Sequence, residues 1–177
     1  CLSLSVSSDS FKFNNYNNHG IVGLINTPTA RFFDEAVHGV TIYNSDEVQK
    51  ITLSSNPYNW LEASFFYMNL PNVRLCRAYP GITPICEGYK DKGFNLKLRL
   101  KEEGIFPAVA IGLMDFAGTG RYSSEYIVTS YGIGKLDMHL GLGWGKLSGS
   151  SKQIKNPLSN LSSRFNERSG GYSGQGG

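Results

Sequence analysis

The residues Phe94–Lys101, FNLKLRLK, decide the fold of this chain together with the later run Leu136–Gly145, LDMHLGLGWG. In both runs apolar and polar residues alternate, and this period of two is typical of a β-strand with one apolar and one polar face. The polar rows carry Lys97, Arg99 and Lys101 as well as several glycines, which indicates an interior lined by water. We therefore expect the apolar rows to face outward, as they do in a transmembrane β-barrel.

The composition fits one β-rich domain that is long enough to close a small barrel. Of 177 residues, 18% are charged and 21 are glycine, and both values favour strands with tight turns over helices. The net charge of +3 is too small and too dispersed to indicate a nucleic-acid surface. No apolar run reaches the ~18 residues of a spanning helix, whereas a spanning strand needs only about 9–11.

Similar alternation elsewhere predicts an all-β fold, an antiparallel meander of about eight strands that forms an outer-membrane β-barrel or part of a larger one. The expected strands cover residues 37–43, 48–54, 60–68, 73–78, 93–101, 105–116, 123–131 and 135–144. The chain does not end on the aromatic-ended strand usual in small outer-membrane barrels. We therefore expect these strands to belong to a larger barrel, because an open edge leaves unpaired backbone groups in lipid.

The composition divides the chain into three parts. Residues 1–19 are rich in Ser and Asn and are expected to form an N-terminal tether, and residues 20–147 form the barrel-type domain. Residues 148–177 are expected to form a loop, a short helix starting at Asn156 and Pro157, and a flexible Gly/Ser tail. Pro28 is expected to restrict its segment to an edge strand or an extended entry.

The three cysteines divide unevenly. Cys76 and Cys86 bracket a segment rich in turn-forming residues, so they either form a disulfide in an oxidising compartment or remain free thiols. A disulfide there would raise the free energy of unfolding by roughly 2–3 kcal/mol. Cys1 followed by small and polar residues is typical of a lipoprotein after cleavage of its signal peptide, which makes Cys1 a candidate for lipidation. The alternative is that its position is an accident of a fragment boundary.

No arrangement of residues predicts an active site. The sequence contains no Gly-x-Ser-x-Gly elbow, its three histidines are far apart, and no metal or cofactor site is expected. Asp115 and Glu125 flank one loop and form the one candidate pair for a glycosidase, but such carboxylates are more often solvated loop charges. We therefore expect a protein that is not an enzyme.

The stretch Gly23–Arg31, GLINTPTAR, resembles the N-terminal signature of the YjbH family of exopolysaccharide biosynthesis proteins, through Thr27, Pro28, Thr29 and Arg31 in particular. The runs 96–100, 107–113, 118–120, 123–126 and 141–145 follow in the order that the family shows. The resemblance implies a Gram-negative outer-membrane β-barrel, often a lipoprotein, acting in secretion or assembly of exopolysaccharide or capsule. Family members are much longer, so it implies an N-terminal portion, and it provides no catalytic residues.

The resulting hypothesis is a non-enzymatic barrel component of polysaccharide export. Its partners would be the polysaccharide, outer-membrane lipid and other proteins of the exopolysaccharide operon. Residues expected to face the lumen and the polysaccharide are Asn95, Lys97, Arg99, Lys101 and His139. The alternative is a secreted soluble β-sandwich that binds carbohydrate and buries Leu96, Leu98, Met138 and Leu140. A hydrolase that uses Asp115 or Glu125 is the third hypothesis.

Overall fold

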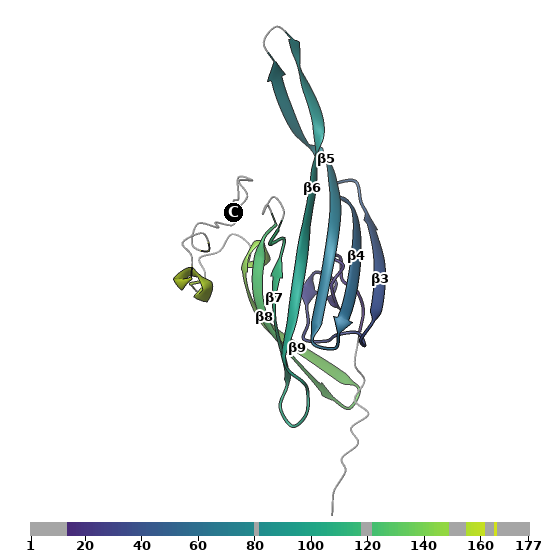
Figure 1. Ribbon diagram of the computed structural model, residues 1–177, viewed down its shortest axis with the longest axis vertical. Helices are drawn as coiled ribbons and strands as arrows, with labels where there is room; N and C mark the ends of the chain where they lie inside the picture. The colour runs from purple at the N-terminus through teal and green to yellow at the C-terminus, as the bar shows by residue number, and fades with distance from the viewer. Residues whose placement is uncertain (1–13, 80–81, 118–121, 149–154, 162–164, 166–177) are drawn as a thin grey trace, which may run out of the picture.

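The computed structural model describes residues 14–79, 82–117, 122–148, 155–161 and 165 (Figure 1). Within these ranges the chain forms a seven-stranded antiparallel sheet in which each strand pairs with the next along the chain. The expected meander is therefore confirmed. Its strands are β3 (Val37–Asn44), β4 (Gln49–Tyr58), β5 (Leu61–Tyr79), β6 (Ile82–Lys101), β7 (Ala108–Met114), β8 (Ser124–Ile133) and β9 (Leu136–Gly145).

Short connections set the register of the sheet. The β3–β4 turn is closed by Ser45, whose backbone N–H donates to the carbonyl of Val48 at 2.9 Å. The β8–β9 hairpin turns at Gly134, whose φ of +59° favours glycine. Both turns lie where the alternation of the sequence predicts them.

The hairpin of β5 and β6 is longer than the sequence predicts and extends well beyond the other strands (Figure 1). Residues 73–78, expected to form a separate weak strand, continue β5 after an irregularity in register between Leu70 and Arg74. Cys76 and Cys86 are cross-strand partners near the tip and form a disulfide. The cysteine segment is therefore an extension of the hairpin, and the disulfide is the one of the two alternatives that the structure shows.

On β4, β6 and β9 the two faces of the sheet have the polarity that the sequence predicts, whereas β5, β7 and β8 also bury apolar residues on the inner side. In β4, Thr52, Ser54 and Asn56 are buried on one face, whereas Ile51 and Leu53 are exposed on the other. We call these the inner and the outer face. The outer face also exposes large apolar side chains on other strands, among them Val40, Ile42, Tyr67, Phe94, Met138, Leu140 and Leu142.

The inner face is covered by residues 14–36, which we call the N-terminal segment (Figure 1). It contains a small hairpin of β1 (Gly23–Leu24) and β2 (Thr27–Pro28). Ile21, Ala30 and Phe32 from this segment pack with apolar residues of β7 and β8, namely Ala108, Ala110, Met114, Tyr126 and Val128. The residues that precede β3 in the chain therefore fold back over the inner face of the sheet.

Residues 14–19, expected to belong to a tether, lie within this packed segment. Tyr16 forms a β-bridge with Val22, and its ring lies over Gly39 of β3, where a Cβ would overlap it. Asn17 is buried, and its side-chain oxygen Oδ1 accepts a hydrogen bond from the backbone N–H of His19 at 2.9 Å. Residues 1–13, including the candidate lipidation site Cys1, lie outside the described residues.

The sheet is not closed, which is consistent with part of a larger barrel. Within the described ranges, β3 pairs with β4 alone and β9 pairs with β8 alone. At the C-terminal end, a 3-10 helix η2 (Pro157–Asn160) begins with Asn156 as its N-cap, as expected, and a second short one, η1, spans Lys146–Ser148. None of the helices described is long and apolar enough to cross a membrane.

Candidate functional site

The centre of the inner face is a fully buried ion pair between Lys97 of β6 and Glu62 of β5. The Lys97 Nζ atom lies 2.5 Å from the Glu62 Oε2 atom, and the two residues are direct cross-strand neighbours. Lys97 Nζ also donates hydrogen bonds to the backbone carbonyls of Val22 at 3.0 Å and Arg31 at 2.9 Å. The Glu62 Oε1 atom accepts a hydrogen bond from the Val22 N–H at 2.7 Å.

The two charged side chains bind the backbone of the N-terminal segment and do not face an open lumen. Removing two charges from water is costly unless further hydrogen bonds satisfy them, and the backbone of Val22 supplies both a donor and an acceptor. The ring of Phe32 lies between two cations, 4.5 Å from Lys97 Nζ and 4.6 Å from the Arg99 guanidinium carbon. The segment thus satisfies the charges of the inner face.

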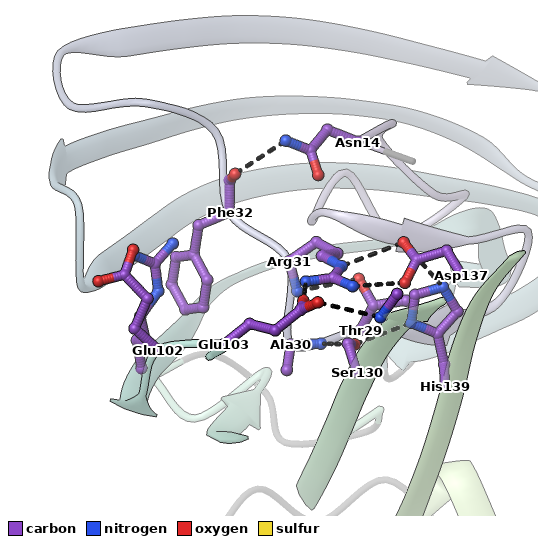
Figure 2. A network of polar contacts seen from close by, with 12 residues as sticks. Asn14, Thr29, Ala30, Arg31, Phe32, Glu102, Glu103, Ser130, Asp137 and His139 are labelled. Atoms are coloured by element: carbon purple, nitrogen blue, oxygen red, sulfur yellow. Dashed lines mark hydrogen bonds and ion pairs between the residues drawn. The ribbon is translucent and has the colours of Figure 1, made fainter. Parts of the chain in front are cut away.

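A second ionic network holds the end of the same segment (Figure 2). The Arg31 guanidinium contacts Asp137 of β9 twice, from Nε at 3.0 Å and from the second terminal nitrogen at 2.5 Å. Its first terminal nitrogen contacts Glu103, in the β6–β7 connection, whose other oxygen accepts from the Gly132 N–H at 3.0 Å. Burial lowers the pKa of Arg31, but the hydrogen bonds to Asp137 and Glu103 outweigh it and raise the pKa above its ordinary value.

Ser130 and His139 extend this network (Figure 2). The Ala30 N–H donates to the Ser130 Oγ atom at 2.9 Å, and that atom lies 2.8 Å from the Nδ1 atom of His139. The His139 Nε2 atom is 3.7 Å from Asp137. His139 therefore belongs to the anchoring of the N-terminal segment.

The remaining residues expected to face the lumen lie in different environments. Asn95 is buried, donates to the Ser64 Oγ atom at 2.9 Å and accepts from the Asp115 N–H at 3.1 Å. Arg99 lies 3.5 Å from Glu102 and is partly exposed. Lys101 does not share the row of Lys97 and Arg99, because the register between β6 and β7 shifts just before it and pairs it with Val109, whereas Arg99 pairs with Ala110.

The residues of the family signature shape the N-terminal segment. Thr29 is buried and its hydroxyl accepts a 3.3 Å hydrogen bond from the Arg31 N–H. Pro28 is buried in β2 and pairs with Gly23, so it ends a two-residue ladder as a strand-edge proline does. Thr27 is exposed and lines a cleft of about 460 Å³ beside the segment. The signature therefore fixes the fold of the segment and its contact with the sheet.

The two carboxylates considered for a glycosidase lie on opposite faces of the sheet. Asp115 borders the cleft on the inner side, where its Oδ2 atom accepts a 2.9 Å hydrogen bond from the Tyr122 N–H. Glu125 lies on the outer side, where it accepts a 3.0 Å hydrogen bond from the Asn156 side chain. These two residues therefore do not flank one glycosidic bond. Among the described residues, no group of three or more His, Cys, Asp or Glu side chains is placed to hold a metal ion.

Three partners of the N-terminal segment were not predicted from the sequence, namely Glu62, Glu103 and Asp137. One signal was present: Glu62 and Asp137 stand at polar-face positions of alternating strands, as Lys97 does. Acidic residues in the same row as cations indicate ion pairing across strands. The pairing of Arg31 spans 72 and 106 residues and has no local signal.

Comparison with known proteins agrees with the resemblance of the signature. The chain is 38% identical over 156 residues to the uncharacterized lipoprotein YjbH of Escherichia coli (strain K12), an alignment that covers 86% of this chain. The chain spans only 22% of the length of that relative. No solved structure matches the chain. Residues 15–177 match the family described as exopolysaccharide biosynthesis protein YbjH, and the chain therefore belongs to the YjbH family.

Proposed function

We propose that this chain is the N-terminal part of an outer-membrane β-barrel that takes part, without catalysis, in the secretion or assembly of exopolysaccharide or capsule. The observation that carries the proposal is the exposed apolar outer face of the sheet, opposite an inner face that buries polar and charged side chains beside its apolar clusters. Thr52, Ser54, Glu62 and Lys97 are buried, whereas outer-face residues such as Leu140 are exposed, in this case by 77%. In water this distribution is unfavourable, because burial of apolar surface would stabilise the fold by about 25 cal/mol per Å², and the exposed side chains do not contribute this stabilisation.

Lipid removes this penalty and adds a requirement. In hydrocarbon, apolar side chains on the outer face are solvated by acyl chains, while unpaired backbone groups cost several kcal/mol each. The free edges of β3 and β9 therefore need further strands to complete a barrel. The difference in length between this chain and its relative is consistent with such strands.

The Gram-negative outer membrane is the proposed location. The name of the relative describes a lipoprotein, which supports an attached lipid at Cys1 and a place in the cell envelope. The Cys76–Cys86 disulfide fits an oxidising compartment. Proposed partners are the polysaccharide, outer-membrane lipid and other proteins of the exopolysaccharide operon.

The use of the charged side chains supports a role without catalysis. Lys97, Glu62, Arg31 and Asp137 are engaged with one another and with the N-terminal segment. The soluble β-sandwich is less well supported, because it requires Met138 and Leu140 to be buried, and they are 43% and 77% exposed.

Arginine substitutions on the outer face test the proposal in the protein as its host expresses it. Leu53→Arg and Leu140→Arg each place a charge where lipid is expected, which costs up to about 2–4 kcal/mol near the bilayer midplane. Asn59→Arg, in the exposed β4–β5 turn, is the matched control. We expect cells with either of the first two variants to contain less of this protein in the outer membrane and less polysaccharide on their surface. Cells with the control variant should retain both.

Equal amounts of all three variants in the outer membrane would contradict the lipid-facing assignment. Release of reducing sugars from the host polysaccharide by the purified wild-type protein would contradict the absence of catalysis.

A further inference from the structure

The cleft beside the N-terminal segment is not used by the ionic networks described above. It has a volume of about 460 Å³, within the range of roughly 300–1,000 Å³ that is typical of small-molecule sites. Its walls come from the N-terminal segment, from strands β3 to β7, from residues at the start of β8 and from residues that follow β9. It is therefore a hollow between the segment and the sheet, on the polar side of the proposed barrel.

Aromatic rings and amides line the cleft together. The rings belong to Tyr43, Phe66 and Tyr122; Tyr43 is 38% exposed, whereas Phe66 is buried beneath Lys50. The side chains of Asn18 and Asn26, which also line the cleft, are joined by a 2.9 Å hydrogen bond. Aromatic rings and hydrogen-bonding amides in one cleft suit a ligand with apolar C–H faces and a rim of hydroxyl groups, such as a sugar ring.

The charges in the cleft favour an anionic ligand. The Lys50 Nζ atom lies 4.7 Å from the centre of the Phe66 ring, and the carboxylates of Asp115 and Asp91 interact with it electrostatically. A second cation, Lys146, lies 5.8 Å from the Tyr122 ring. The carboxylate of Asp115 already accepts a backbone hydrogen bond from Tyr122. The lining thus holds two cations and one engaged carboxylate.

We infer that this cleft binds a sugar residue of an acidic polysaccharide, with Lys50 pairing with the carboxylate of the sugar and the aromatic rings contacting its C–H face. The inference rests on the proposed function, because it names the class of polysaccharide that the barrel would handle. It assigns to Lys50 the role that the sequence pattern gave to Lys97, whose ammonium group is enclosed by the N-terminal segment. A uronic acid is the simplest sugar with this chemistry.

Calorimetric titration of the purified protein with a tetramer of galacturonic acid and with its methyl ester tests the inference. The ester keeps the rings and removes the charge. We expect the acid to bind the wild-type protein at least about tenfold more tightly than the ester, Lys50→Gln to abolish this preference, and Lys50→Arg to retain it. Lys135→Gln, which removes an equal charge from the exposed β8–β9 turn, should bind as the wild type does.

Three results would overturn the inference: no binding of either sugar, equal binding of acid and ester, or an unchanged preference in Lys50→Gln. Because the ester carries no charge, retained binding of the ester by Lys50→Gln shows that its loss of preference is not a folding defect. Outer-membrane fractionation of the same variants separates this inference from the proposed function. A protein that reaches the outer membrane but ignores the acidic tetramer contradicts only the inference about the cleft.

Discussion

Replacing Arg31 with methionine removes a guanidinium that is 4% exposed, and it leaves the buried carboxylates of Glu103 and Asp137 without this cation. Loss of one partner of a buried ion pair costs about 3–5 kcal/mol, because the remaining charge stays desolvated. Since every 1.4 kcal/mol is about tenfold, the N-terminal segment should open roughly two to four orders of magnitude more often. Hydrogen exchange measures this as lost protection of the amides in residues 20–33, relative to those of β7.

A triple variant provides the decisive comparison. Arg31→Met combined with Glu103→Gln and Asp137→Asn removes the cation and both charges that it neutralises, so the penalty for unpaired carboxylates disappears. We expect the triple variant to recover a large part of the lost protection, and Lys135→Met at the exposed turn to lose none. The reasoning fails if Arg31→Met alone leaves exchange in residues 20–33 within about twofold of the wild type, or if the triple variant exchanges faster still.

Three further predictions concern the sheet, its long hairpin and the pH response of the N-terminal segment. Gly112→Ala should lower the thermal unfolding temperature, because its Cβ would overlap an aromatic ring of β8, while Gly104→Ala, with no atom within 4 Å, should not. Replacing Cys76 and Cys86 with serine should lower the free energy of unfolding by roughly 2–3 kcal/mol in chemical denaturation, and an unchanged midpoint would contradict a stabilising role for the disulfide. Burial and the nearby charge of a lysine lower the pKa of His19 to about 4, so the folded segment binds fewer protons than the unfolded one. The hydrogen-exchange protection of the segment should therefore fall as the pH drops from about 6.5 towards 4. His19→Gln should lose this pH dependence.

The regular part of the fold follows from local pattern. Alternation in Phe94–Lys101 and Leu136–Gly145 predicts both the strands and which side chains share a face, because side chains of a strand alternate without exception until a bulge intervenes. Lys101 shows the limit of this rule. The shift in register just before it moves it out of the row of Lys97, and no feature of the local sequence marks that irregularity.

The candidate site is less accessible to prediction from sequence, because it depends on contacts between distant residues. The alternation predicts that Lys97 is a hydrated cation, yet the N-terminal segment encloses it. Its ammonium group bonds to the backbone of Val22, 75 residues away, and of Arg31, 66 residues away. Periodicity describes which face a residue occupies but not what covers that face. The cleft lined by Lys50 likewise arises only when the segment and the strands are brought together.

The collision rates of spin labels with lipid-soluble oxygen distinguish a lipid-facing side of the sheet from a water-facing one. Val40 and Ile42 of β3 are 64% and 75% exposed on the outer face, and Thr41 between them points to the inner face. Labels placed singly at these three positions in the membrane-embedded protein should show high, low and high oxygen accessibility, with the opposite order for a water-soluble nickel complex. Equal values at all three positions, or low oxygen accessibility at Val40 and Ile42, would contradict a lipid-facing outer face.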